Sequence, residues 1–122
     1  MKVLVIGENG QLGRSIKALV NNSSKMYKYF FLGSKELDLK NINAVKTYFK
    51  KNNFDVIINC AAYTLVDLAE SNNKDANLIN HLSIKIIAEI ASQSETKLIH
   101  ISTDYVFDGL NKQAYLETDK TN

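Results

Sequence analysis

The 122-residue sequence contains no proline, a single cysteine, and no apolar run approaching the ~18 residues that a membrane-spanning helix requires. Because Cys60 has no partner within the chain, no internal disulfide can form, which is typical of proteins from a reducing cytoplasm. The N-terminus also lacks the layout of a signal peptide. These absences predict a cytoplasmic protein without a membrane span.

Neither sign of charge is in large excess, since 15 basic residues face 13 acidic ones and the net charge is +2. Arg14 is the only arginine and the lysines are scattered, which favours solvated faces over a surface that binds nucleic acid or membranes. No Gly/Ser-rich linker, charge block or repeat divides the chain. The sequence therefore predicts one domain over residues 1–122.

Short apolar runs alternate with helical patterns along the chain. The runs predict buried strands at Val3–Ile6, Tyr29–Leu32, Val56–Ile58 and Leu98–Ile101. The apolar stripes of the intervening helices are Leu12, Ile16, Leu19 and Val20; Ile42, Val45 and Phe49; and Ile79, Leu82, Ile86, Ile87 and Ile90. This alternation predicts a Rossmann-like, doubly wound α/β fold with a parallel sheet that is covered on both faces.

The polar tail Leu116–Asn122 contrasts with these apolar runs. No run after Phe107 is long enough to supply a further strand. The expected sheet is therefore incomplete, with an open edge.

Three glycines follow the first predicted strand with the spacing G-x-x-G-x-x-G. Gly7 would allow a sharp turn, Gly10 would allow the backbone to approach a pyrophosphate, and Gly13 would allow the helix to pack closely. The start of the following helix offers N–H groups and a positive dipole end to phosphates. A glycine-rich turn without a ligand is the weaker alternative.

The end of the second predicted strand is where a dinucleotide's ribose 2′ group would bind. Ser34 and Lys35 could accept the 2′-phosphate of NADPH, while Glu36 comes slightly late for a 2′-hydroxyl; a plain surface lysine is the alternative. Asp38 and Leu39 could contact an adenine, although Asp38 could equally cap its own loop. The pattern favours NADPH, with NADH possible.

The third predicted strand runs into small residues. Ala61 and Ala62 leave space for a flat coenzyme at the carboxyl end of the sheet. Thr64 and Asp67 could instead form the start of a helix. Cys60 is interpreted as a small core residue.

The fourth predicted strand ends in Ser102–Gly109, which carries hydroxyl and carboxyl groups. A hydroxyl there can stabilise the charge that develops on a carbonyl oxygen during reduction, although a capped strand end is the alternative. His100 is expected in the strand interior and His81 on a solvated helix face. No metal site is predicted.

These residues resemble the dTDP-4-dehydrorhamnose reductase family of extended short-chain dehydrogenase/reductases. The matching segments are Gly7–Gly13, Asp55–Thr64, Ser102–Gly109 and Tyr115–Asp119. The family makes dTDP-L-rhamnose from a 4-keto nucleotide sugar. The resemblance implies that the coenzyme is lined by Gly10, Gln11, Leu12, Asp38, Leu39, Ala61, Ala62, Tyr63 and Thr64.

The same resemblance gives roles to the fourth strand end. Thr103 would be the hydroxyl of the catalytic triad, Asp104 and Tyr105 would lie near the sugar, and Asn80 would be the family's helix asparagine. Where some members carry a metal-binding glutamate at a dimer interface, this sequence has Arg14 and Ser15. The sequence therefore lacks this glutamate ligand for a metal-linked dimer, and a homo-oligomer is kept as an alternative to a monomer.

The family's proton donor, a tyrosine four residues before a lysine, is absent, because none of the six tyrosines has that neighbour. The chain is therefore expected to be the N-terminal, coenzyme-binding part of a longer reductase and to be inactive by itself. Two alternatives stay open: another sugar-nucleotide epimerase or dehydratase of the superfamily, and a non-catalytic nucleotide-binding regulatory subunit.

Overall fold

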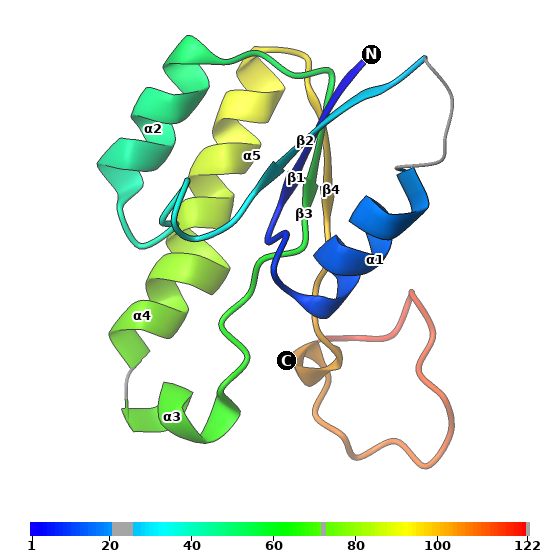
Figure 1. Cartoon of the computed structure of the whole chain (residues 1–122). Coiled ribbons are helices and arrows are strands. Elements are labelled where there is room, and N and C mark those ends of the chain that lie inside the picture. The colour runs from blue at the N-terminus through cyan, green and yellow to red at the C-terminus, as the bar shows by residue number, and fades with distance from the viewer. Residues whose placement is uncertain (21–25, 72, 122) are drawn as a thin grey trace.

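The structure, a computed structural model, describes residues 1–20, 26–71 and 73–121. Its centre is a parallel sheet in the order β2-β1-β3-β4 (Figure 1). The strands are β1 (Lys2–Ile6), β2 (Lys28–Leu32), β3 (Val56–Asn59) and β4 (Lys97–His100). They lie within a residue or two of the predicted strands, so the parallel α/β sheet is confirmed.

The helices cover the sheet from both sides. Figure 1 shows α1 (Gln11–Val20) over one face, and α2 (Ile42–Lys51) and α5 (Ser83–Gln93) over the other. Between β3 and α5 the chain forms α3 (Val66–Ser71), α4 (Asn73–Asn77) and a π-helical turn, η1 (Leu78–Leu82). A short 3₁₀ turn, η2 (Asp104–Val106), follows β4. The doubly wound arrangement is thus confirmed.

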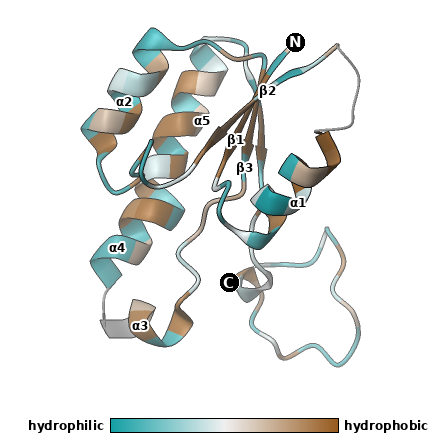
Figure 2. Cartoon of the chain, in the orientation of Figure 1, coloured by the Kyte–Doolittle hydropathy of each residue, from teal (hydrophilic) through white to brown (hydrophobic). Residues whose placement is uncertain are grey.

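The main core lies between the sheet and the α2/α5 layer. Because successive strand residues point to opposite faces, Leu4 and its register partner Ile57 share one face and pack in the same cluster as Val45 of α2 and Ile87 of α5. All four are at most 1% exposed. Figure 2 shows the central strands β1 and β3 largely in the hydrophobic colours, as expected of strands that are buried on both faces.

The prediction that every strand is covered on both faces is wrong for β4. Ile99 is 49% exposed and Ile101, which falls just beyond the strand, is 47% exposed. The physical reason is position: β4 pairs with β3 alone in the described sheet, so one edge and much of one face remain open. The expected open edge is therefore at β4.

Within residues 1–20, 26–71 and 73–121, no helix combines the length and the hydropathy needed to cross a membrane.

Candidate functional site

The glycine loop turns directly out of β1 and packs against the exit of β3. Gly7 has φ +89°, a conformation that side chains rarely adopt. A Cβ on Gly7 would also lie 2.6 Å from the Ala61 nitrogen and 2.8 Å from the Cys60 carbonyl carbon. The predicted turning role of Gly7 is therefore accompanied by a close backbone contact that the spacing did not indicate.

The other two glycines of the loop differ sharply in their surroundings. A Cβ on Gly13 would overlap the Gly7 carbonyl oxygen and lie 2.8 Å from the Glu8 Cα, so α1 can approach the loop only without a side chain there. A Cβ on Gly10 would meet just the Gly7 oxygen, at 3.4 Å. The fold therefore requires Gly13 to lack a side chain but leaves open space at Gly10.

This open space lies at the N-terminus of α1, where the first N–H groups of a helix have no partner within the helix. Gln11 and Leu12, the first residues of α1, are exposed beside it. Backbone N–H groups, a positive dipole end and free room are what a pyrophosphate needs. The glycine loop therefore fits the phosphates of a dinucleotide.

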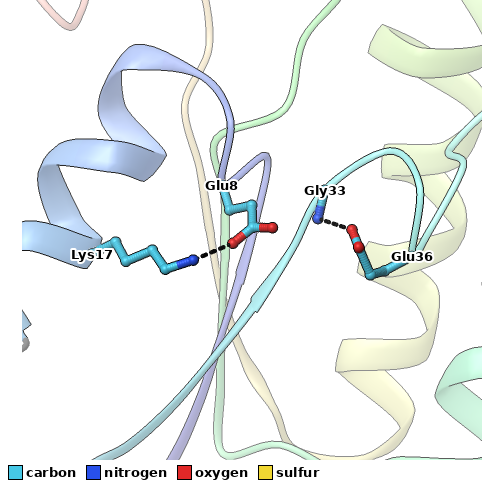
Figure 3. A network of polar contacts seen from close by, with 4 residues as sticks. All are labelled: Glu8, Lys17, Gly33 and Glu36. Carbon is cyan, nitrogen blue, oxygen red and sulfur yellow. Dashed lines mark hydrogen bonds and ion pairs between the residues drawn. The ribbon is translucent and has the colours of Figure 1, made fainter.

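Polar side chains gather where β2 ends, as Figure 3 shows. The Glu36 carboxylate folds back over its own turn and accepts a hydrogen bond from the Gly33 N–H at 2.9 Å. The Glu8 carboxylate forms an ion pair with the Lys17 Nζ at 2.7 Å. The turn therefore returns the Glu36 carboxylate to Gly33 at the end of β2, while the prediction that Glu36 comes slightly late for a ribose 2′-hydroxyl stays a prediction. Ser34 and Lys35 are exposed on that turn.

The two residues expected near an adenine have structural roles in the fold. The Asp38 carboxylate accepts a hydrogen bond from the Lys40 N–H at 2.9 Å, so Asp38 caps its loop, the alternative that the sequence left open. Leu39 is 6% exposed and belongs to the hydrophobic core. Its side chain therefore presents very little surface to a ligand.

The segment after β3 is held by two asparagine side chains. Asn59, fully buried, accepts from the Ala61 N–H and donates to the Ala61 carbonyl oxygen, both at 3.3 Å. Asn80, in η1, accepts from the Tyr63 N–H at 2.8 Å and donates to the Tyr63 carbonyl oxygen at 3.0 Å. Ala62, between the two clamps, is exposed. π-Helical turns are often found at functional sites.

The other residues near this segment differ in their exposure to solvent. Ala61 and Tyr63 are half-buried, and Thr64 is exposed and precedes α3. Burial raises the pKa of the half-buried Cys60 thiol, which keeps it protonated near neutral pH and agrees with a packing role.

The residues after β4 lie at the same edge of the sheet as the glycine loop, because β1, β3 and β4 are parallel. The Thr103 hydroxyl oxygen accepts a hydrogen bond from the Tyr105 N–H at 3.2 Å, and the Tyr105 side chain is 73% exposed. Asp104 begins η2, and its side chain lies outside the described part of the structure.

His100 differs from its predicted position. It is the exposed last residue of β4, and its Nδ1 lies 3.0 Å from the Asn59 amide nitrogen. It is therefore at the site edge and not in a strand interior. His81 is exposed on a helix, as predicted. In the described ranges, no three His, Cys, Asp or Glu side chains gather as metal ligands.

A local network orders the loop beyond η2. The rings of Phe107 and Tyr115 stack with centroids 4.3 Å apart, and the Tyr115 hydroxyl donates to the Asp108 carboxylate at 2.9 Å. The Leu110 N–H and this hydroxyl lower the pKa of Asp108 below its ordinary value. The network gives the exposed loop a defined shape without a core of its own.

The sequence did not predict three features at the carboxyl edge of the sheet. They are the hydrogen bond of Glu36 to Gly33, the Glu8–Lys17 ion pair and the pair of hydrogen bonds between Asn59 and Ala61. Only Asn59 gave a signal in the sequence, because it is a polar residue at the end of an apolar strand. The other two depend on side-chain directions that spacing does not specify.

Comparison with known proteins gives consistent matches over the whole chain. A protein-family model described as "RmlD substrate binding domain" matches residues 1–122. The dTDP-4-dehydrorhamnose reductase of Aggregatibacter actinomycetemcomitans is 41% identical over 119 residues, which are 97% of this chain and 40% of that protein. This chain thus spans about two-fifths of the length of the curated relatives it matches.

Solved structures agree with the sequence matches. The dTDP-4-dehydrorhamnose reductase of Clostridium acetobutylicum has 38% identity and a TM-score of 0.92, covering 100% of this chain and 43% of that one. The Bacillus anthracis reductase, solved in complex with NADP, has 35% identity and a TM-score of 0.88, covering 98% and 42%. These matches confirm the resemblance that the motifs indicated.

Proposed function

The chain belongs to the RmlD substrate binding domain family, and from this premise we propose that it supplies the coenzyme site of an NADPH-dependent reductase. The reaction is the reduction of dTDP-4-dehydro-L-rhamnose to dTDP-L-rhamnose, as the names of its relatives suggest. NADH is a second coenzyme for the same site. The observation that carries the proposal is the open space at Gly10, at the N-terminus of α1.

Each part of the edge has a role in this function. Gly7 and Gly13 give the loop its shape, Gly10 leaves room for the pyrophosphate, and Gln11 and Leu12 hold it with backbone N–H groups, since the Gly10 N–H is bonded to the Gly7 carbonyl oxygen. The clamped segment Ala61–Thr64 lies at the same edge and forms the wall for the remainder of the coenzyme. The relative from Bacillus anthracis, solved with NADP, supports this assignment.

The chemistry needs a polarised keto group and a proton. When bound, the reduced coenzyme supplies a hydride to the keto carbon. The Thr103 hydroxyl polarises the keto oxygen, and Asp104 and Tyr105 contact the sugar. No tyrosine of residues 1–122 precedes a lysine by four residues, so this chain binds the coenzyme and orients the substrate without supplying that proton donor. A protein with one unpaired cysteine is suited to a cytoplasmic location.

The decisive experiment is coenzyme binding by the chain with Gly10→Val. The added side chain enters the space proposed for the pyrophosphate, and its Cβ would meet only the Gly7 oxygen of the fold, at 3.4 Å. We therefore expect NADPH titrations followed by fluorescence to show the loss of binding, with a melting temperature close to that of the original chain.

The matched control is Ser92→Val, at an exposed position in the last turn of α5, which leads away from the glycine loop toward the start of β4. Because serine and valine have similar helix propensities, this variant should leave both NADPH affinity and melting temperature unchanged. Equal NADPH affinity for the original chain and the Gly10→Val variant would overturn the coenzyme assignment.

A further inference from the structure

Two carboxylates and an amide surround the residue that ends β2. A Cβ on Gly33 would lie 3.0 Å from a Glu36 carboxylate oxygen and 3.5 Å from one of Glu8, and would overlap the Asn9 amide nitrogen. We call these three side chains, Glu8, Asn9 and Glu36, the Gly33 rim. Figure 3 shows the two glutamates facing Gly33 from opposite sides.

The Gly33 rim joins the glycine loop to the end of β2. The N–H groups of Gly7 and Glu8 both donate to the Leu32 carbonyl oxygen, at 2.9 and 3.1 Å. In a dinucleotide-binding fold, the pyrophosphate sits at the glycine loop and the adenosine ribose 2′ group reaches the end of the second strand. The rim is therefore the part of this chain that a 2′-hydroxyl or a 2′-phosphate would meet.

We propose that the carboxylate of Glu36, assisted by that of Glu8, lowers the NADPH/NADH affinity ratio of this chain. Lys17 and Lys35 have the opposite effect and raise the ratio. This inference rests on the proposed coenzyme site and concerns which of the two coenzymes that site favours. The acidic side chains form no separate site. They affect how strongly the proposed coenzyme site binds the ribose 2′-hydroxyl of NADH or the 2′-phosphate of NADPH.

Glu36 is the dominant member because its position is fixed and no ion pair within the described ranges offsets its charge. One carboxylate oxygen is held by the Gly33 N–H, which keeps the group at the end of β2. A carboxylate accepts a hydrogen bond from a ribose 2′-hydroxyl and repels a 2′-phosphate. Glu36 therefore favours NADH on both counts.

Glu8 contributes less because Lys17 neutralises it. The Lys17 Nζ lies 2.7 Å from the Glu8 carboxylate and 5.4 Å from the centre of the Phe31 ring, so α1 holds this cation beside the rim. Lys35 stands exposed on the same turn as Glu36. Cations and carboxylates are thus balanced around Gly33, which is the pattern expected of a site that accepts both coenzymes.

The test is a comparison of dissociation constants for NADPH and NADH, measured by coenzyme fluorescence on the 122-residue chain. Glu36→Gln keeps an acceptor for the Gly33 N–H but removes the charge, so the NADPH/NADH affinity ratio should rise about tenfold. Lys17→Met frees the Glu8 charge and should lower the same ratio several-fold. Glu89→Gln, an exposed position on α5, makes the same charge change elsewhere and should leave the ratio unchanged.

Ionic strength provides a second readout. Asn9 and Glu36 are exposed and the Glu8 side chain is 18% exposed, so the effect of the Glu36 charge should shrink at about 1 M salt, where charges are screened over about 3 Å. A merely structural role for Glu36 would change both affinities together, so Glu36→Gln would show the same NADPH/NADH ratio as the original chain at low and at high salt.

The experiment distinguishes a failure of the proposed function from a failure of the inference about Glu36. If the original chain binds neither coenzyme, the proposed function fails and the inference fails with it. If both coenzymes bind and the ratio is the same in the original chain and in Glu36→Gln, the inference is overturned while the coenzyme site stands.

Discussion

Replacing Gly13 with alanine tests whether the close approach of α1 to the glycine loop is a requirement of the fold. The new Cβ would overlap the Gly7 carbonyl oxygen and lie 2.8 Å from the Glu8 Cα and 2.9 Å from the Gly7 carbonyl carbon. All three are backbone atoms, so no side-chain rotation can relieve the contact. The loop is also anchored by the Leu32 carbonyl on one side and packs against Ala61 on the other.

Two effects of opposite sign decide the size of the change. Alanine in place of glycine within a helix stabilises by about 1 kcal/mol. Overpacking against an unyielding neighbour costs about 1–3 kcal/mol, and sometimes more. Because the contact here is with anchored backbone, we take the upper end of that range and expect a net loss of about 2 kcal/mol. For a domain of this size the melting temperature should fall by roughly 8 °C.

The assay is thermal unfolding followed by circular dichroism, with Gly10→Ala as the matched control. A Cβ on Gly10 stands at an ordinary 3.4 Å from one oxygen, so that variant should melt within about 2 °C of the original chain. A Gly13→Ala variant that melts at or above the original temperature would refute the packing argument, since the helix-propensity gain would then be acting alone.

Other predictions concern the clamp and the outer loop. Asn80→Ala removes both hydrogen bonds to Tyr63, worth about 0.5–1.5 kcal/mol each, so hydrogen exchange at the Tyr63 amide should accelerate and NADPH affinity should fall; unchanged exchange would contradict this role. Tyr115→Phe removes a hydrogen bond to Asp108, so NMR titration should show the pKa of Asp108 rising toward its ordinary value, while the Leu110 N–H still holds it below. Because folding lowers this pKa, the associated stability is present at neutral pH and is lost as the pH falls through the folded-state pKa of Asp108, and the variant should lose it at a higher pH.

The strands and the face-covering helices could be predicted because each depends on a regular pattern. Four short apolar runs, each too short for a helix, located β1 to β4 to within a residue or two. The glycine spacing likewise indicated the roles of Gly7 and Gly13, since both follow from steric needs at fixed offsets from the first strand. The short helices α3 and α4 carried no comparable period: only the start of α3 was indicated, by Thr64 and Asp67 as an alternative interpretation, and α4 was not predicted.

The polar architecture of the edge was not predictable from spacing. Glu36 acts on Gly33 because a tight turn, with the Glu36 and Leu37 N–H groups both bonded to the Gly33 carbonyl, reverses the chain between them. The position of His100 was misjudged for a related reason: the apolar run continues to Ile101, but the pairing with β3 ends one residue earlier. Apolar patterns locate strands more reliably than they locate the residue at which pairing stops.

The two asparagine clamps explain how a segment without regular structure can be positioned at the carboxyl edge of the sheet. A backbone residue offers one N–H donor and one carbonyl acceptor, and a carboxamide is the side chain that presents the complementary acceptor and donor together. Asn59 pairs in this way with Ala61, and Asn80 pairs with Tyr63, from a strand end and a π-helical turn respectively. A carboxylate at either position would face a carbonyl oxygen without a proton to share. The amides therefore replace the strand hydrogen bonds that end at β3, and Ala62 is held exposed between them, where the proposed coenzyme would lie.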